Sequence, residues 1–186
     1  MISSILLTGI SLSFFAFNMI IDSDSEQAFL ENFEPFCGYA YAGETTYFDL
    51  GAEELKDPEL LMLLEACDED EVRIPFWVDD DRSRTWILDI REDGLRLSHD
   101  HRYEDGSEHE ANMYGGFSDE RGSETKHYYP ADEATIEDRP AREINVWSTE
   151  LDIENEVYYY RLYLDGELSY EAKFDLGEPI PFDEVY

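Results

Sequence analysis

The stretch VYYYRLYLDGELSYEAKF, residues 157–174, decides the fold. It contains two runs rich in aromatic residues on either side of Asp165-Gly166. Asp-Gly between such runs is a strong signal for a β-hairpin with a two-residue turn. A regular hairpin closed by this turn pairs Arg161 with Tyr170, so we expect Arg161 on an apolar, aromatic face.

Alternating apolar and polar residues recur along most of the chain, and Asp-Gly occurs a second time at residues 105–106. The alternating runs cover residues 72–78, 84–90, 95–103, 109–117, 126–129, 143–153, 157–164 and 168–176. About eight antiparallel strands joined by short turns predict an all-β meander. Closure removes exposed strand edges, so we expect an up-and-down, calycin-like barrel, with an open sandwich as the alternative. Helix is expected only near the N-terminus and over residues 132–137.

The first 21 residues contain no ionisable side chain, and residues 5–21 are mostly apolar. This pattern predicts a signal peptide or an N-terminal apolar anchor over residues 1–22. A polar linker is then expected over residues 23–35, followed by a single β-rich domain over residues 36–186. We therefore expect an exported protein.

The chain of 186 residues is strongly acidic, with 46 Asp and Glu against 13 Lys and Arg and a formal net charge of −33. Such a surface repels phosphate backbones and anionic lipids, which excludes nucleic acid and anionic membranes as partners. The charge and the scarcity of lysine indicate adaptation to high salt, where repulsion between carboxylates is screened. The alternative is an acidic protein from an ordinary habitat.

Cys37 and Cys67 are the two cysteines of the chain. In an exported protein an even pair predicts a disulfide. Two buried free thiols are the alternative.

Five blocks of sequence stand out together: IPFWVDDDRSRTWIL (74–88), GLRLSHDHRYEDGSE (94–108), MYGG (113–116), PAD (130–132) and NVW (145–147). They resemble a family of uncharacterised secreted bacterial proteins, from about Cys37 to the C-terminus. The resemblance implies export and a compact β-rich domain, and it implies no known activity. The family often has histidine where this chain has Trp77 and Tyr103, which weighs against a site built on a histidine cluster.

A candidate metal site lies on the hairpin around Asp105-Gly106. A two-residue turn there pairs His101 with Glu110 and places His99 on the same face. Two imidazoles and a cross-strand carboxylate suit a divalent cation such as zinc, so His99, His101 and Glu110 are the predicted ligands. The alternative is that both histidines bond to neighbouring carboxylates.

Two arginines are candidate ligand-binding residues. Arg84 alternates with Trp86, so an inward-facing Trp86 places Arg84 at the mouth of the barrel, where it must be paired. Its partner is either an internal carboxylate or an anionic ligand.

The other arginine, Arg161, is expected inside the barrel among Tyr159, Tyr163 and Tyr170. There it either holds an anionic ligand or forms a structural plug with the stacked tyrosines.

These patterns favour an exported, non-enzymatic barrel that binds a small apolar or anionic molecule. The alternative is a metal-binding protein or a metal-dependent enzyme. No nucleophile motif occurs, and no feature of the sequence indicates an oligomeric state.

Overall fold

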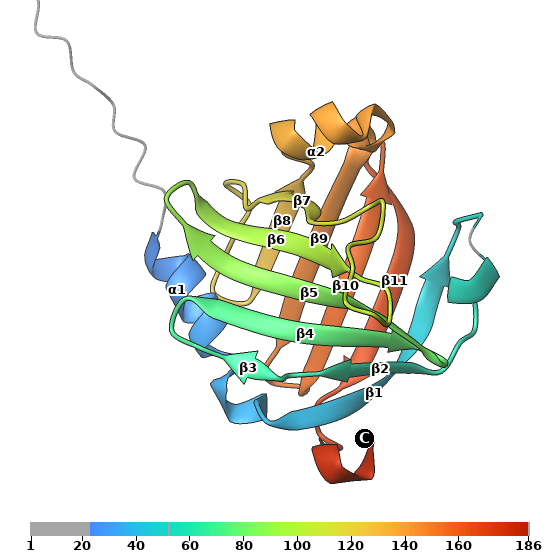
Figure 1. Cartoon of the computed structure of the whole chain (residues 1–186). Coiled ribbons are helices and arrows are strands. Elements are labelled where there is room, and N and C mark those ends of the chain that lie inside the picture. Colours follow the sequence, from blue (N-terminus) through green and yellow to red (C-terminus); the bar gives the residue numbers. More distant parts are fainter. Residues whose placement is uncertain (1–22, 52, 186) are drawn as a thin grey trace, which may run out of the picture.

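The computed structural model describes residues 23–51 and 53–185, and its strands form one antiparallel sheet of 12 strands (Figure 1). The strands are β1 (Tyr39–Phe48), β2 (Leu60–Leu63), β3 (Ala66–Cys67), β4 (Glu71–Val78), β5 (Asp81–Arg91), β6 (Gly94–His101), β7 (Tyr114–Phe117), β8 (Lys126–Pro130), β9 (Asn145–Asp152), β10 (Val157–Leu164), β11 (Glu167–Asp175) and β12 (Ile180–Pro181). The helices are α1 (Ser23–Glu31) and α2 (Glu133–Asp138), with short 3-10 segments η1 (Glu34–Phe36), η2 (Glu53–Leu55), η3 (Pro140–Ile144) and η4 (Phe182–Glu184).

The sheet curls into a nearly closed up-and-down barrel, which confirms the predicted fold class (Figure 1). Its order is β7-β6-β5-β4-β2-β1-β11-β10-β9-β8, so most strands lie beside their neighbours in sequence. The predicted series began at residue 72 and lacked β1. This strand lies between β2 and β11 and joins the first part of the sheet to the last.

The two ends of the sheet, β7 and β8, approach each other at a seam, and two glycines of β7 allow close contact with its neighbours. A Cβ atom on Gly116 would lie 1.8 Å from the carbonyl oxygen of Pro130 on β8, and one on Gly115 would lie 1.8 Å from that of Leu97 on β6. The backbone N–H of Asp132 donates to the Gly115 carbonyl at 3.0 Å across this seam. Only glycine permits this approach, which explains the glycines of the MYGG block.

Helix α2 is anchored beside the seam, where residues 132–137 were expected to be helical. Asp132 caps the helix by accepting the backbone N–H of Thr135 at 2.8 Å. The same carboxylate accepts from the guanidinium of Arg96 at 2.9 Å, and Arg96 is only 5% exposed. This buried ion pair positions α2 and the following segment η3 on the barrel.

The expected linker over residues 23–35 is wrong, because this segment is part of the packed body. It forms α1, and Phe29, Leu30 and Phe33 are almost fully buried in the barrel core. The spacing of the two phenylalanines places both rings on one side of the chain as it enters the barrel. Burial of these rings stabilises the packed position of the segment despite the polar residues around them. The predicted signal peptide or anchor over residues 1–22 lies outside the described residues.

No helix within the described part of the chain is long and apolar enough to cross a membrane.

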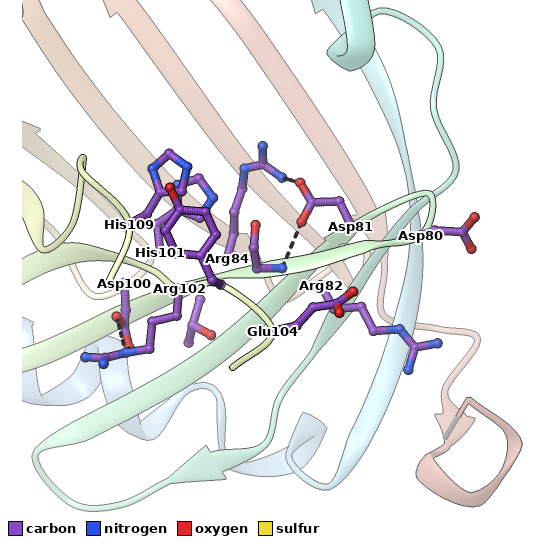
Figure 2. A pocket seen from close by; sticks show the side chains of 12 residues that line it. Asp80, Asp81, Arg82, Arg84, Asp100, His101, Arg102, Glu104 and His109 are labelled. Carbon is purple, nitrogen blue, oxygen red and sulfur yellow. Dashed lines mark hydrogen bonds and ion pairs between the residues drawn. The ribbon is translucent and has the colours of Figure 1, made fainter. Parts of the chain in front are cut away.

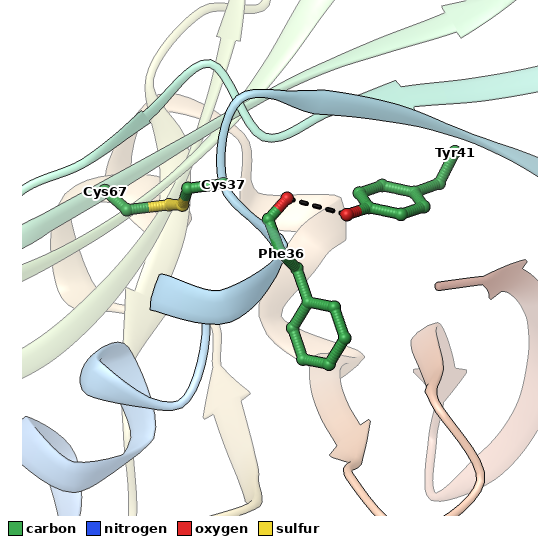
Figure 3. Close-up of a disulfide and its surroundings, with 4 residues drawn as sticks. All are labelled: Phe36, Cys37, Tyr41 and Cys67. Carbon is green, nitrogen blue, oxygen red and sulfur yellow. Dashed lines mark hydrogen bonds between the residues drawn. A yellow bond between two sulfur atoms is a disulfide. The ribbon is translucent and has the colours of Figure 1, made fainter. Parts of the chain in front are cut away.

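A disulfide joins Cys37 to Cys67, as predicted, with the two Cα atoms 6.3 Å apart (Figure 3). Cys37 follows η1 and Cys67 lies on β3, so the bond ties the N-terminal segment to the sheet. Next to it, the Tyr41 hydroxyl donates to the Phe36 carbonyl at 2.7 Å. Disulfides are typical of oxidising compartments.

Replacing both cysteines with serine should lower the free energy of unfolding by about 3.5 kcal/mol, because the unfolded chain regains the entropy of an open loop. Urea titration with and without dithiothreitol measures this loss. Reductant should destabilise the wild type and leave the C37S/C67S variant unchanged. Equal stability of the reduced and oxidised wild type would contradict the prediction.

Candidate functional site

A cavity of about 330 Å³ lies inside the barrel and is lined mainly by aromatic side chains. Its aromatic walls are Phe76, Trp86, Tyr114, Trp147, Tyr160 and Tyr170, and its polar lining residues are Arg84, His99, Arg142 and Asn145. Leu50, Leu55 and Leu162 complete it. Its volume and its apolar walls with few polar groups are typical of sites for small organic molecules.

The cavity occupies the half of the barrel away from α1. Helix α1 contacts β5 and β6, and Glu26 lies against Gly94 in the turn that joins them. Trp86 and His99 are paired farther from that turn on the same two strands. The helix therefore closes one end of the barrel, and the cavity lies toward the other.

One wall is a stack of three rings with Trp86 at its centre. The Trp86 ring lies 4.3 Å from that of Phe76 and 4.2 Å from that of Tyr160, with interplanar angles of 17° and 12°. Trp86 is 2% exposed. Trp86 therefore faces inward, the orientation under which Arg84 is expected at the mouth of the barrel, and the stack gives the cavity a rigid side.

His99 connects the Tyr160 side chain of this stack to the backbone of β7 through two hydrogen bonds. One ring nitrogen, Nδ1, lies 3.1 Å from the carbonyl oxygen of Tyr114, and the other, Nε2, lies 2.7 Å from the Tyr160 hydroxyl. Because a carbonyl only accepts, Nδ1 carries the proton and Nε2 accepts from Tyr160. Burial, together with the charges of Arg142 and Arg96, lowers the pKa of His99 to about 3, so the ring is neutral.

The predicted metal site does not form. His99 uses both ring nitrogens within the barrel wall, and its strand partner is Tyr114. Glu110 is exposed, and its backbone carbonyl accepts from the Arg139 side chain. No group of three His, Cys, Asp or Glu side chains that could hold a metal occurs among residues 23–51 and 53–185.

The metal prediction failed because the return chain leaves the sheet. Across the Asp105-Gly106 turn the two chain segments form only a single bridge, between Arg102 and Glu108. Regular strand pairing resumes only at Tyr114, which pairs with His99. His101 instead lies at the rim, where its ring stacks on that of His109 at 4.1 Å. Burial and the nearby Arg84 lower the pKa of His101.

The rim carries a second hollow, a charged groove of about 780 Å³ (Figure 2). Arg102 donates to Asp100 at 2.9 Å within it, and Arg84 pairs with Asp81. The charges of the groove are thus largely compensated by the protein itself. The sequence predicted either an internal carboxylate or an anionic ligand as the partner of Arg84. The structure shows a carboxylate of the protein itself, that of Asp81.

Arg161 lies on the opposite face of β10 from the one predicted. The turn itself forms as expected, with positive φ angles of 51° at Asp165 and 81° at Gly166. Tyr163 pairs with Leu168, but Leu162 pairs with Tyr170, so Ser169 is an extra residue on β11. Such a bulge exchanges the two faces of the rest of the hairpin.

The bulge directs Tyr158, Tyr160 and Leu162 toward the core and Arg161 away from it. The Arg161 guanidinium donates to Glu150 at 2.6 Å and to Glu171 at 2.5 Å, and it lies over the Tyr159 ring. Tyr163 lies on this outer face with Arg161 and Tyr159. Tyr170, the fourth residue of the predicted cluster, lines the cavity instead.

Most of the lining residues were absent from the predicted site, among them Arg142, Asn145, Trp147 and Tyr160. Tyr160 was missed because the bulge cannot be seen in the alternation of residues. Asn145 and Trp147 belong to the NVW block, which was noted only as a resemblance. Arg142 lies in η3, outside any strand, so no periodic signal assigns it to the barrel interior.

The fold and the cavity together define a small antiparallel β-barrel with an aromatic internal cavity. Comparison of the sequence with family models and with curated proteins finds no match.

Proposed function

We propose that the protein is an exported binding protein whose barrel takes up one small molecule with a flat, apolar body. The observation that carries this proposal is the aromatic cavity of about 330 Å³. Parallel rings at about 4 Å, as in the Phe76–Trp86–Tyr160 stack, leave flat surfaces on which a planar ligand packs well. The disulfide and the resemblance to secreted bacterial proteins support export.

Binding suits the chemistry of the cavity better than catalysis. A general base near neutral pH needs a pKa near the working pH, whereas the pKa of His99 is about 3. Burial also raises the pKa of Tyr160 well above its ordinary value. Both groups are held neutral and bonded to each other, so they act as a fixed polar point in an apolar wall.

The neutral fluorophore N-phenyl-1-naphthylamine tests the proposal, because it has a flat naphthalene ring, is apolar and carries no charge. Trp86 and Trp147 line the cavity, whereas Trp77 lies in a separate cluster outside it. In the Trp77→Phe variant we expect saturable quenching of tryptophan emission with one probe per chain, measured in about 1 M KCl to screen the surface charge.

A matched pair of variants locates the probe. Leu162 lines the cavity, and Leu61 packs outside it against Trp77. Leu162→Trp should weaken probe binding at least about tenfold by filling the cavity, and Leu61→Trp should leave it unchanged. Equal binding by both variants, or several weak sites per chain, would refute the proposal.

A further inference from the structure

Arg142 is unusual in this chain because it has no carboxylate partner among the described residues. Eight of the ten arginines form ion pairs: Arg73, Arg84, Arg91, Arg96, Arg102, Arg121, Arg139 and Arg161. Within residues 23–51 and 53–185, Arg82 and Arg142 form none. Arg82 is exposed and lies over Trp77 on the outside of the barrel. Arg142, in contrast, lines the aromatic cavity.

The Arg142 guanidinium lies over one wall of the cavity. Its central carbon is 3.5 Å from the centre of the Tyr114 ring, and that ring is parallel to the His99 ring at 4.4 Å. Stacking of this kind fixes the plane of the guanidinium and leaves its N–H edges free to donate. The other arginine at the cavity, Arg84, is already neutralised by Asp81.

A second polar group lies close by in the sequence and lines the same cavity. Asn145 is 9% exposed, and its side-chain amide makes no hydrogen bond to any residue in the described part of the chain. Its backbone carbonyl is used, since it accepts from Ala131 at 3.0 Å. An amide without a protein partner at the wall of a cavity is available to bond to a ligand or to water.

We propose that the ligand is a planar organic carboxylate whose anionic group binds the Arg142 guanidinium, with the Asn145 amide as an additional donor. The apolar part of the ligand packs against Trp147 and the Trp86 stack. One guanidinium balances one negative charge. A dianion such as a phosphate monoester would leave one negative charge uncompensated in the apolar cavity. The inference rests on the proposed function and specifies its ligand class.

Naphthalene-2-carboxylate and its neutral amide, naphthalene-2-carboxamide, are a matched pair of probes that differ in charge and hardly in shape. In about 1 M KCl the wild type should bind the carboxylate at least about tenfold more tightly than the amide, because a charge-assisted hydrogen bond is stronger than a neutral one. Arg142→Gln should abolish this preference while leaving binding of the amide unchanged. Unchanged amide binding also shows that the variant is folded.

Arg82→Gln is the control, because Arg82 is likewise stacked on an aromatic ring and unpaired but lies outside the cavity. It should keep the full preference for the carboxylate. Equal affinity of the wild type for both probes, or a preference that persists in Arg142→Gln, would overturn the inference while leaving the proposed function standing. Failure to bind these probes and N-phenyl-1-naphthylamine alike would reject the proposed function itself.

Discussion

Acidification from about pH 8 to about pH 5 in 1 M KCl should lower the free energy of unfolding by about 4 kcal/mol. Two buried histidines cause this effect. Burial lowers the pKa of His99 to about 3 and that of His127 to about 4, from an ordinary value of 6.5. For His99, the charges of the Arg142 and Arg96 guanidinium groups contribute to this shift.

The sign follows from the protons bound by each state. Below about pH 6.5 both histidines take up a proton in the unfolded chain but remain neutral in the barrel. The unfolded state therefore binds more protons, and the free energy of unfolding decreases as the pH is lowered. Each histidine contributes about 2 kcal/mol by pH 5. High salt is needed because carboxylate protonation relieves repulsion in dilute buffer and acts in the opposite direction.

Urea titrations at several pH values measure the effect, and two variants divide it. His99→Gln and His127→Asn should each lose about half of the pH dependence, since each removes one of the two buried imidazoles. His127 is 0% exposed and bonds to Ser118 at 2.6 Å, far from the cavity residues. A wild type whose stability is flat or rises between pH 8 and pH 5 would contradict the prediction.

Trp86→Ala should cost about 4 kcal/mol of stability. Trp86 is 2% exposed and lies between two parallel rings, so its removal leaves a hole that Phe76 and Tyr160 cannot fill. Trp86→Phe keeps an aromatic ring in the stack and should cost less than half as much.

Unfolding in urea measures these losses, because guanidinium chloride would itself screen the charge of the chain. Tyr103→Ala is the comparison variant. Tyr103 is aromatic but 53% exposed, and its loss should change stability by no more than about 0.5 kcal/mol. Equal losses for Trp86→Ala and Tyr103→Ala would show that the stack does not stabilise the barrel.

Local patterns in the sequence determined the fold class. Alternation of apolar residues, as around Trp86, predicts strands and their inner faces, because it depends only on the pleat of each strand. The Asp165-Gly166 turn formed as predicted, because its positive φ angles are a local preference of these residues. The disulfide also followed from an even pair of cysteines in a chain expected to be exported.

Tertiary structure decided which side chains line the cavity. The extra residue at Ser169 turned Arg161 outward and Tyr160 inward, since one residue of slip exchanges the faces of a strand. The second Asp-Gly turn has positive φ only at Gly106, and the chain after it leaves the sheet, so the predicted pairing of Glu110 with His101 does not form.

Sequence periodicity carries no information on contacts between distant segments outside the strands. Arg142 reaches the cavity only because η3 follows α2, which Asp132 and Arg96 hold at the barrel seam. Phe29 and Phe33 enter the core only because the closed barrel leaves an open end for α1. The sequence by itself thus determined most of the strands, the Asp165-Gly166 turn and the disulfide. Packing between distant segments determined the site, because register and closure depend on the whole sheet at once.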